Sequence, residues 1–344
     1  MSNLKYRAIG AAFETLSLSG LPRLIRRQSA AKGVIFTLHR VLPEAPQPFS
    51  PNAILQVTPD FLETVIEKVR ALGFDWLSLD DALERLSPSG AGQRPFAVLT
   101  FDDAYRDNLI HALPILQKHN CPFTLYVPTA LVDGKGEIWW QALEDIIAAN
   151  NSIVVDGADV PTFDLVAKQA VFDKLYWQMR EMPEEDRVRL IHQLAGDHGV
   201  SLFAHCRQLI MDWDELDAFV KEPLCTLGAH TVHHYELSKL TRDGMRAEIA
   251  NSVSIIRQKT GIEPQHLSYP IGSTRAAGER EYKMAAALGL KSGVTTIPGG
   301  LYAHHAEDMM ALPRISLNGY YQKKRYVDVY LTGALFTALS KYIG

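Results

Sequence analysis

The sequence predicts an α/β protein built around parallel β-strands. Short runs rich in β-branched and aromatic residues alternate with segments whose apolar residues recur at helical spacing, and this rhythm favours strands that are paired through crossover helices. Several predicted strands end in an ionisable residue, as is typical where a barrel delivers side chains to an active site. The 344 residues have room for one large α/β barrel or for two ordinary domains.

The overall composition narrows the functional classes. A hydrophobic content of 47% with 22% charged residues is that of an ordinary globular protein, and no apolar run reaches the roughly 18 residues of a transmembrane helix. The net charge of −4 gives no electrostatic argument for nucleic-acid binding. The three cysteines are widely spaced and odd in number, so we expect no disulfide framework and a reducing compartment.

The N-terminal segment, residues 1–32, differs in charge from the rest of the chain. Six basic residues against Glu14 give it +5, which leaves −9 for the remainder. Its apolar residues make it amphipathic, either as a helix that packs on the outside of a barrel or as one whose basic face contacts a membrane surface. Glu14 interrupts the apolar stretch and no clear small-residue cleavage site follows, so we expect no secretory signal and a cytoplasmic protein, with the inner membrane surface as the alternative location.

The first part of the chain begins the strand–helix alternation. Residues 33–39 form a compact β-branched run that ends in His39, which is either a site residue at the strand's exit or a buried structural histidine. A helix is predicted over 58–73, because a Thr-Pro-Asp start is followed by apolar residues at helical spacing and then by glycine. Further strands are predicted over 76–79, 98–103 and 122–127.

The alternation stops between residues 134 and 222, where helical patterns predominate and only 153–155 read as a strand. We expect a helical insertion between strands of the barrel. One of its amphipathic segments begins with Trp139 and Trp140. Such aromatic residues more often belong to a core than to a carbohydrate platform, and Trp139 is kept as a candidate for the substrate groove.

The alternation then resumes and continues to the end of the chain. The pattern predicts strands over 225–230, 266–270, 292–296 and 312–317, and helices over 241–259, 279–288 and 326–343.

Two neighbouring carboxylates, Asp102 and Asp103, follow the strand predicted over 98–103. Consecutive strand residues point to opposite faces, but at the turn that follows they can fork, one toward a metal and one toward a reacting water. The alternative interpretation is a helix start, because Asp is favoured at N-caps and in the first helical turn.

A second pair lies at the end of the strand predicted over 225–230. His230 and His234 are four residues apart, and on one helical turn they would share a face and hold one metal ion. Two imidazoles and one carboxylate with an open position are a common catalytic zinc arrangement. Together the two pairs favour a metal site over solvated turn residues.

These pieces resemble the motifs of a known family. Thr100-Phe101-Asp102-Asp103 and His230-Thr231-Val232-His233-His234 resemble the first two motifs of the NodB-like polysaccharide deacetylases, carbohydrate esterase family four. Ser268-Tyr269-Pro270-Ile271-Gly272 resembles the family's groove-wall motif. The three occur in the family's order, and the resemblance covers residues 33–317, most of the chain.

The resemblance implies a fold and a domain organisation. The fold is a distorted (β/α) barrel of about seven parallel strands with a helical insertion. Applied to this chain, it implies a basic amphipathic segment over 1–32, barrel parts over 33–133 and 223–320, the insertion over 134–222 and a C-terminal helix over 321–344.

The resemblance also implies roles for individual residues. Asp103, His230 and His234 would bind a divalent metal, with zinc expected, which polarises the acetyl carbonyl and lowers the pKa of its bound water toward about 7. Asp102 would be the general base, and a backbone N–H near Tyr126 or Val127 would help to hold the oxyanion. The candidate substrate contacts are Tyr126, Tyr269, Pro270, Gly272 and Trp139.

The sequence departs from the family pattern at two positions. Ser268 stands where the family usually has an arginine that orients the base. Leu312-Pro313-Arg314 stands where the family usually has a late Leu-x-His that carries the general acid. An arginine cannot donate its proton at neutral pH, so the general acid must come from elsewhere.

Other residues could fill both positions. His39, His304 or His305 could supply the acid, and Arg314 could either pair with Asp102 in place of the missing arginine or bind the substrate. The sequence alone leaves these alternatives open.

The leading functional hypothesis is a metal-dependent hydrolase that removes N-acetyl groups from an N-acetylhexosamine-containing saccharide or glycoconjugate. The same barrel and metal site could instead hydrolyse a small non-sugar amide, because fold does not fix substrate. A third hypothesis is a saccharide-binding protein that has lost turnover, which the missing histidine would explain.

Overall fold

The protein is described by a computed structural model that covers residues 3–87 and 92–343. Its centre is a sheet with the strand order β11-β10-β9-β6-β5-β1-β12, and β4 pairs with β5 beside this path. The strands are β1 Gly33–Leu38, β4 Asp75–Trp76, β5 Phe96–Phe101, β6 Phe123–Val127, β9 Cys225–Ala229, β10 His266–Ser268, β11 Ser292–Val294 and β12 Ile315–Ser316. All of these pairs are parallel, as the strand–helix alternation predicted.

The sheet curls so that its two edges meet. The N–H of Thr295 donates to the carbonyl of Leu312, and the N–H of Leu312 donates to the carbonyl of Gly293, both at 2.9 Å. These bonds join β11 to the segment that leads into β12 at the other edge of the sheet. The distorted (β/α) barrel expected from the sequence is therefore confirmed.

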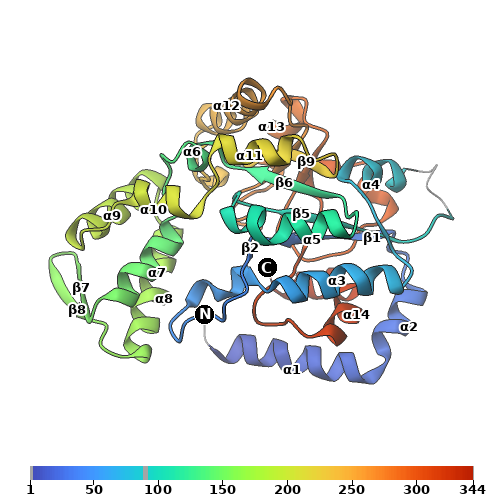
Figure 1. The fold of residues 1–344 in the computed structure, drawn as a ribbon, viewed down its shortest axis with the longest axis horizontal. Helices are drawn as coiled ribbons and strands as arrows, with labels where there is room; N and C mark the ends of the chain where they lie inside the picture. Colours follow the sequence, from blue (N-terminus) through green and yellow to red (C-terminus); the bar gives the residue numbers. More distant parts are fainter. Residues whose placement is uncertain (1–2, 88–91, 344) are drawn as a thin grey trace.

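Helices cover the outer face of the curled sheet, and Figure 1 shows α11, α12 and α13 above the strands and α3 and α14 below them. Residues of β1, β5 and β6 are buried throughout, as expected for parallel strands with two covered faces. The helices of the barrel are α3 Pro59–Ala71, α4 Leu79–Leu86, α5 Leu113–Lys118, α6 Thr129–Val132, α11 Trp213–Val220, α12 Arg242–Thr260 and α13 Glu279–Ala287. Thr58 caps α3 by accepting the N–H of Phe61 at 3.2 Å, so this helix begins where the sequence predicted.

The insertion forms a separate helical lobe at the left of Figure 1. It contains α7 Trp139–Ala149, α8 Leu165–Glu181, α9 Glu184–Asp197 and α10 Leu202–Leu209, with the antiparallel strands β7 Ser152–Val155 and β8 Ala158–Pro161. The sequence indicated only the first of these strands, because β8 is largely exposed and ends in proline. The turn that joins them, Asp156-Gly157, has positive φ at both residues, as two-residue hairpin turns require.

The N-terminal segment packs on the outside of the barrel. It forms α1 Asn3–Ser19 and α2 Leu21–Gln28, which meet at Gly20 with φ of +70°. Phe13 of α1 is buried, and its ring stacks on Tyr321 with 5.0 Å between ring centroids. Glu14 accepts a bond from the Lys323 ammonium group at 3.1 Å. The packing interpretation of this segment is therefore confirmed for its inner face.

The end of the chain differs from the single helix predicted over 326–343. It contains α14 Val327–Tyr330 and α15 Ala334–Ile343. Gly333, with φ of +48°, interrupts the helical path between them, because this backbone conformation cannot continue a right-handed helix.

No helix in the described ranges is long and apolar enough to cross a bilayer. The remaining elements of the described chain are short. They are β2 Arg40–Val41 paired with β3 Gln56–Val57, the π-helical Asn108–Ala112, and 3₁₀ turns at Pro51–Leu55, Leu237–Lys239, Ala303–Ala306, Met309–Ala311 and Lys324–Tyr326.

Candidate active site

Asp102 and Asp103 follow β5 directly and turn into the mouth of the barrel. The N–H of Asp102 still donates to the Leu38 carbonyl of β1 at 3.0 Å. Asp103 and Ala104 then adopt φ of +73° and +57°, a left-handed conformation that is costly for residues with a Cβ. The next helical segment begins at Arg106, after the bridge residue Tyr105. The helix-cap interpretation of the two aspartates is therefore wrong, and the strained turn is what separates their carboxylates.

His230 and His234 lie in the loop after β9 and not on a helical turn. This corrects the helical geometry expected from their spacing. Thr231 and His234 have φ of +63° and +58°, and the N–H of His234 donates to the Thr231 hydroxyl at 3.1 Å. The fold of this loop, rather than helical periodicity, turns both imidazoles toward Asp103.

Three buried ligand atoms converge at this point. The Oδ1 atom of Asp103 lies 3.4 Å from Nε2 of His230 and 3.3 Å from Nε2 of His234, and one potential ligand atom from each residue lies within 4.8 Å of the others. Oδ1 of Asp103 has no hydrogen-bond partner although it is buried. A buried carboxylate oxygen without a partner, facing two imidazole nitrogens, is costly alone and fits a divalent cation.

The hydrogen bond of His230 and the lowered pKa of His234 also suit metal binding. Nδ1 of His230 lies 2.7 Å from the Ser268 carbonyl, which can only accept, so Nδ1 carries the proton and Nε2 keeps its lone pair. Burial lowers the pKa of His234 to about 3, although the Asp103 carboxylate opposes this shift. A neutral imidazole is the form that binds a metal.

Asp102 is held by Arg314, from the segment that precedes β12. The two guanidinium Nη atoms donate to the two carboxylate oxygens at 2.8 and 2.7 Å. Burial tends to raise the pKa of Asp102, but the charge and hydrogen bonds of Arg314 outweigh it and hold this pKa well below its usual range. Of the two alternatives for Arg314, the structure therefore contains the pair with Asp102.

The other donors of Arg314 are also satisfied in the interior. Arg314 is buried, its Nε donates to the Thr295 carbonyl at 2.9 Å, and its Nη atoms reach Thr100 Oγ1 at 3.1 Å and Ser268 Oγ at 2.9 Å. The Ser268 hydroxyl in turn donates to Asp102 at 3.2 Å. Ser268 stands where the family usually has arginine, and it contacts the same carboxylate. Its side chain is small, which leaves space for the guanidinium of Arg314 from the segment before β12.

A groove of about 1000 Å³ opens above these residues, between the barrel and the insertion. His39, Asp102, Asp103, His230 and His234 line its base. Its walls carry a set of aromatic side chains: Tyr6, Phe49, Trp139, Trp140, Phe172, Tyr176, Trp177 and Tyr320. The candidate Trp139 belongs to this lining, although its side chain is buried. Sequence patterns missed Tyr6, Phe49 and Tyr320, because they come from α1 and from two loops without a motif.

Four of the other candidate substrate contacts do not line the groove. Tyr126 and Tyr269 are buried, with the Tyr126 ring 5.8 Å from the Arg314 guanidinium carbon and the Tyr269 hydroxyl donating to the Met310 carbonyl at 2.9 Å. Pro270 and Gly272 are also buried, and a Cβ at Gly272 would lie 2.7 Å from the backbone nitrogen of Thr296. Burial leaves these side chains no surface for a ligand, so they shape the site from behind.

Of the three histidines considered for the general acid, His39 is the one in the groove. Its side chain lines the groove together with both carboxylates. His304 and His305 belong to the 3₁₀ turn Ala303–Ala306 and are absent from the lining of the groove.

A parallel barrel that gathers an aspartate pair and two histidines at the carboxyl ends of its strands has the arrangement of a barrel enzyme with a candidate metal site. Comparison with protein families then identifies the group within this class. The sequence pattern described as polysaccharide deacetylase matches residues 89–293, more than half of the chain. The chain belongs to the polysaccharide deacetylase family, whose members are hydrolytic enzymes that deacetylate sugars.

Relatives and solved structures agree with this assignment. YxkH of Bacillus subtilis (strain 168), which is named as a polysaccharide deacetylase, is 21% identical over 294 residues, covering 86% of this chain and 74% of YxkH. The Streptococcus pyogenes deacetylase PplD matches with a TM-score of 0.52 and 19% identity, over 85% of this chain and 94% of PplD. IcaB from Ammonifex degensii matches with a TM-score of 0.53 and 14% identity, over 87% and 97%. At these identities the two structures support the fold alone.

Proposed function

We propose that this chain is a metal-dependent N-deacetylase that acts on an N-acetylhexosamine-containing saccharide or glycoconjugate. One observation carries the proposal: the Asp103, His230 and His234 cluster lies at the base of the groove beside Asp102, whose carboxylate is fixed by Arg314. One carboxylate and two imidazoles suit zinc better than the hard oxygen-seeking cations.

Asp103, His230 and His234 would hold the metal. When bound, the metal would supply a Lewis acid for the acetyl carbonyl and would make a water molecule more acidic. His230 is already oriented for this by its bond to the Ser268 carbonyl, because that bond fixes both the tautomer and the direction of Nε2.

Asp102 would accept a proton from the attacking water. Its fork with Arg314 keeps it ionised and fixes the direction of both oxygens, and geometry comes before basicity in a general base. Arg314 therefore acts as a positioning residue, and its permanent charge lowers the basicity of Asp102 in exchange for alignment.

His39 would donate the proton that the leaving nitrogen needs. Water adds to the acetyl carbon, the C–N bond breaks, Asp102 takes one proton and His39 gives one, so the products are acetate and a free amine. Its place at the base of the groove near both aspartates supports His39 over His304 and His305. A backbone N–H near Tyr126 or Val127 remains our candidate for the donor that stabilises the oxyanion.

The aromatic walls of the groove support a saccharide as substrate. Flat side chains with exposed surface, such as Tyr176 and Tyr320, can lie against the apolar faces of sugar rings, while polar groups between them fix orientation. A groove of about 1000 Å³ is larger than a small amide needs, which argues against the non-sugar amidase.

Acetate release from chito-oligosaccharides, with and without a chelator and with zinc added back, tests the proposal. We expect release that the chelator abolishes and zinc restores. Release only from small non-sugar amides would favour the amidase alternative. Saccharide binding without release at full metal occupancy would favour a protein that has lost turnover.

A further inference from the structure

The corner where α1 meets α2 exposes leucines and arginines together. Leu18, Leu21 and Leu24 are 71%, 44% and 50% exposed, and Arg23 and Arg27 are exposed beside them. Neither arginine side chain forms a hydrogen bond or ion pair with the described residues, whereas Arg26 pairs with Asp328 at 3.0 Å. Large exposed apolar residues next to unpaired cations are the composition of an interfacial surface.

The outer face of α1 extends this corner with small residues and one exposed cation, Arg7. Ala8, Ala11, Ala12 and Thr15 are exposed, while Phe13 and Glu14 on the inner side fix the helix to the barrel through Tyr321 and Lys323. A solvent-facing helix side usually carries charges. A helix side that carries small residues, no exposed acidic residue and the exposed cation Arg7 therefore suits contact with an anionic interface.

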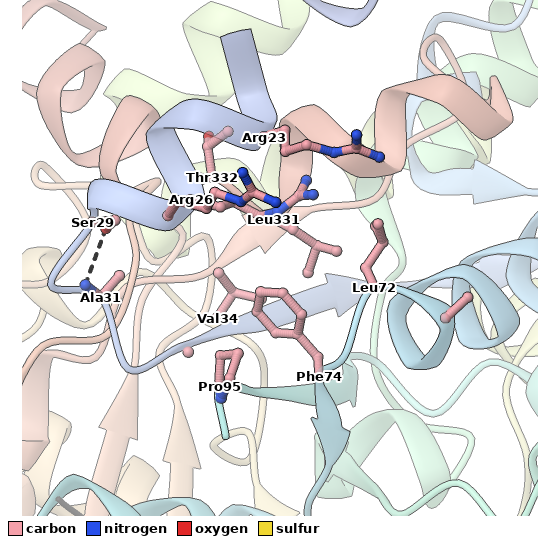
Figure 2. Close-up of a pocket in the computed structure, with 13 residues that line it drawn as sticks. Arg23, Arg26, Ser29, Ala31, Val34, Leu72, Phe74, Pro95, Leu331 and Thr332 are labelled. Atoms are coloured by element: carbon pink, nitrogen blue, oxygen red, sulfur yellow. Dashed lines mark hydrogen bonds between the residues drawn. The ribbon is translucent and has the colours of Figure 1, made fainter. Parts of the chain in front are cut away.

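A cavity of about 490 Å³ opens beneath α2, at the end of the barrel opposite to the active site. Figure 2 shows Arg23 and Arg26 over an apolar floor that includes Val34, Phe74 and Pro95. The lining contains three arginines and no acidic residue. A basic rim over an apolar floor matches the two parts of an anionic lipid, a phosphate headgroup and the start of its acyl chains.

The distribution of charge along the chain points the same way. Residues 1–32 carry +5 and the remainder −9, so an anionic surface attracts this corner and repels the rest of the molecule. In a symmetric dimer built on this corner, two basic segments would face and repel each other. This favours a lipid surface as the occupant.

We propose that the α1–α2 corner docks this protein onto a membrane surface that contains anionic lipids. Leu18, Leu21 and Leu24 enter the interface, and Arg23 and Arg27 pair with lipid phosphates. This proposal stands independently of the catalytic function, because none of these residues belongs to the groove.

The test is sedimentation of the full-length protein with vesicles of phosphatidylcholine alone or with phosphatidylglycerol added. We expect binding only to the anionic vesicles, weakened by salt. The double variant Arg23→Gln/Arg27→Gln should bind about 30-fold more weakly, as expected for about two lost basic residues near a charged surface. Leu18→Ser/Leu21→Ser/Leu24→Ser should bind at least about tenfold more weakly at unchanged net charge.

The matched control is Ile110→Ser/Arg246→Gln, which removes an exposed apolar residue and an exposed arginine elsewhere. It should bind vesicles like the unaltered protein, and every variant should keep its melting temperature. Absence of binding to anionic vesicles overturns the proposal, as does equal loss in the control. Binding of inorganic phosphate that depends on Arg23 without vesicle binding, or a dimer that the leucine variant dissociates, would identify a different occupant and also overturn it.

Discussion

The charged residues considered at the two ends of the barrel differ in burial and in pairing. At the carboxyl ends of the strands, Asp102 and Arg314 are buried and joined by two hydrogen bonds. At the opposite end, Arg23 and Arg27 are exposed and have no partner among the described residues. Buried pairing fixes positions to the accuracy that chemistry needs, whereas exposed unpaired charge is available to something outside the molecule.

The largest effect should come from separating the two aspartates. Asp102→Asn leaves the cluster of Asp103 and the two histidines intact, so metal should remain while turnover falls by about 10²–10⁴ if general-base catalysis is the main loss. Asp103→Asn weakens a charged ligand, so metal content should fall and excess zinc should restore part of the activity. Metal analysis and acetate release on both variants check this, and equal metal loss from both would show that the division of roles is wrong.

Removing Arg314 should damage stability as well as activity. Arg314→Leu leaves the Asp102 carboxylate buried without its partner, which costs about 3–5 kcal/mol in comparable pairs. The double variant Asp102→Asn/Arg314→Leu should recover part of the lost stability, because no buried charge remains unpaired. Urea unfolding of the two single variants and the double variant measures this coupling. If the three effects simply add, the fork does not carry the energy assigned to it.

Loss of the proposed acid should be smaller and confined to turnover. His39→Gln should lower the rate by about 10²-fold, the lower end for acid–base catalysis, with metal content unchanged. His304→Gln, outside the groove, serves as the control and should keep its rate. Steady-state kinetics on chito-oligosaccharides decides between them, and a His39 variant with full activity would falsify this role.

The smallest effect is expected at the opposite end of the barrel. Arg23→Gln/Arg27→Gln should change the free energy of unfolding by no more than about 0.5 kcal/mol, as is usual for exposed residues without partners. Urea unfolding in the absence of lipid provides the measurement. A loss comparable to that of Arg314→Leu would mean that these arginines belong to the fold and would remove the contrast between the two ends.

The sequence predicted what depends on local pattern. The strand–helix alternation and the aspartate and histidine motifs placed most strands correctly, because buried parallel strands are short apolar runs and their exits carry the ionisable residues. It left open whether Arg314 pairs with Asp102 or binds the substrate, since the two residues are far apart in the sequence and the family's motif position holds Ser268. It also misjudged the histidine loop, because positive φ at Thr231 and His234 has no signal in residue type.

The groove was predictable only in part for a similar reason. Trp139 was recognised from its amphipathic segment, but Tyr6 and Tyr320 come from distant parts of the chain that only the fold brings together. The choice of His39 over His304 likewise needed the three-dimensional arrangement.

Arg314 also lies at the seam of the barrel. Its N–H donates to the Ile297 carbonyl at 3.0 Å, just beyond β11, and the next residue, Ile315, pairs with Phe36 of β1. Arg314, the proposed positioning residue for Asp102, is thus also part of the contact that closes the barrel between β11 and β12. Opening this contact would misalign Asp102 while leaving Asp103, His230 and His234 in place. Activity should therefore report whether the barrel is closed at this point. Low concentrations of urea should abolish activity before the sheet unfolds.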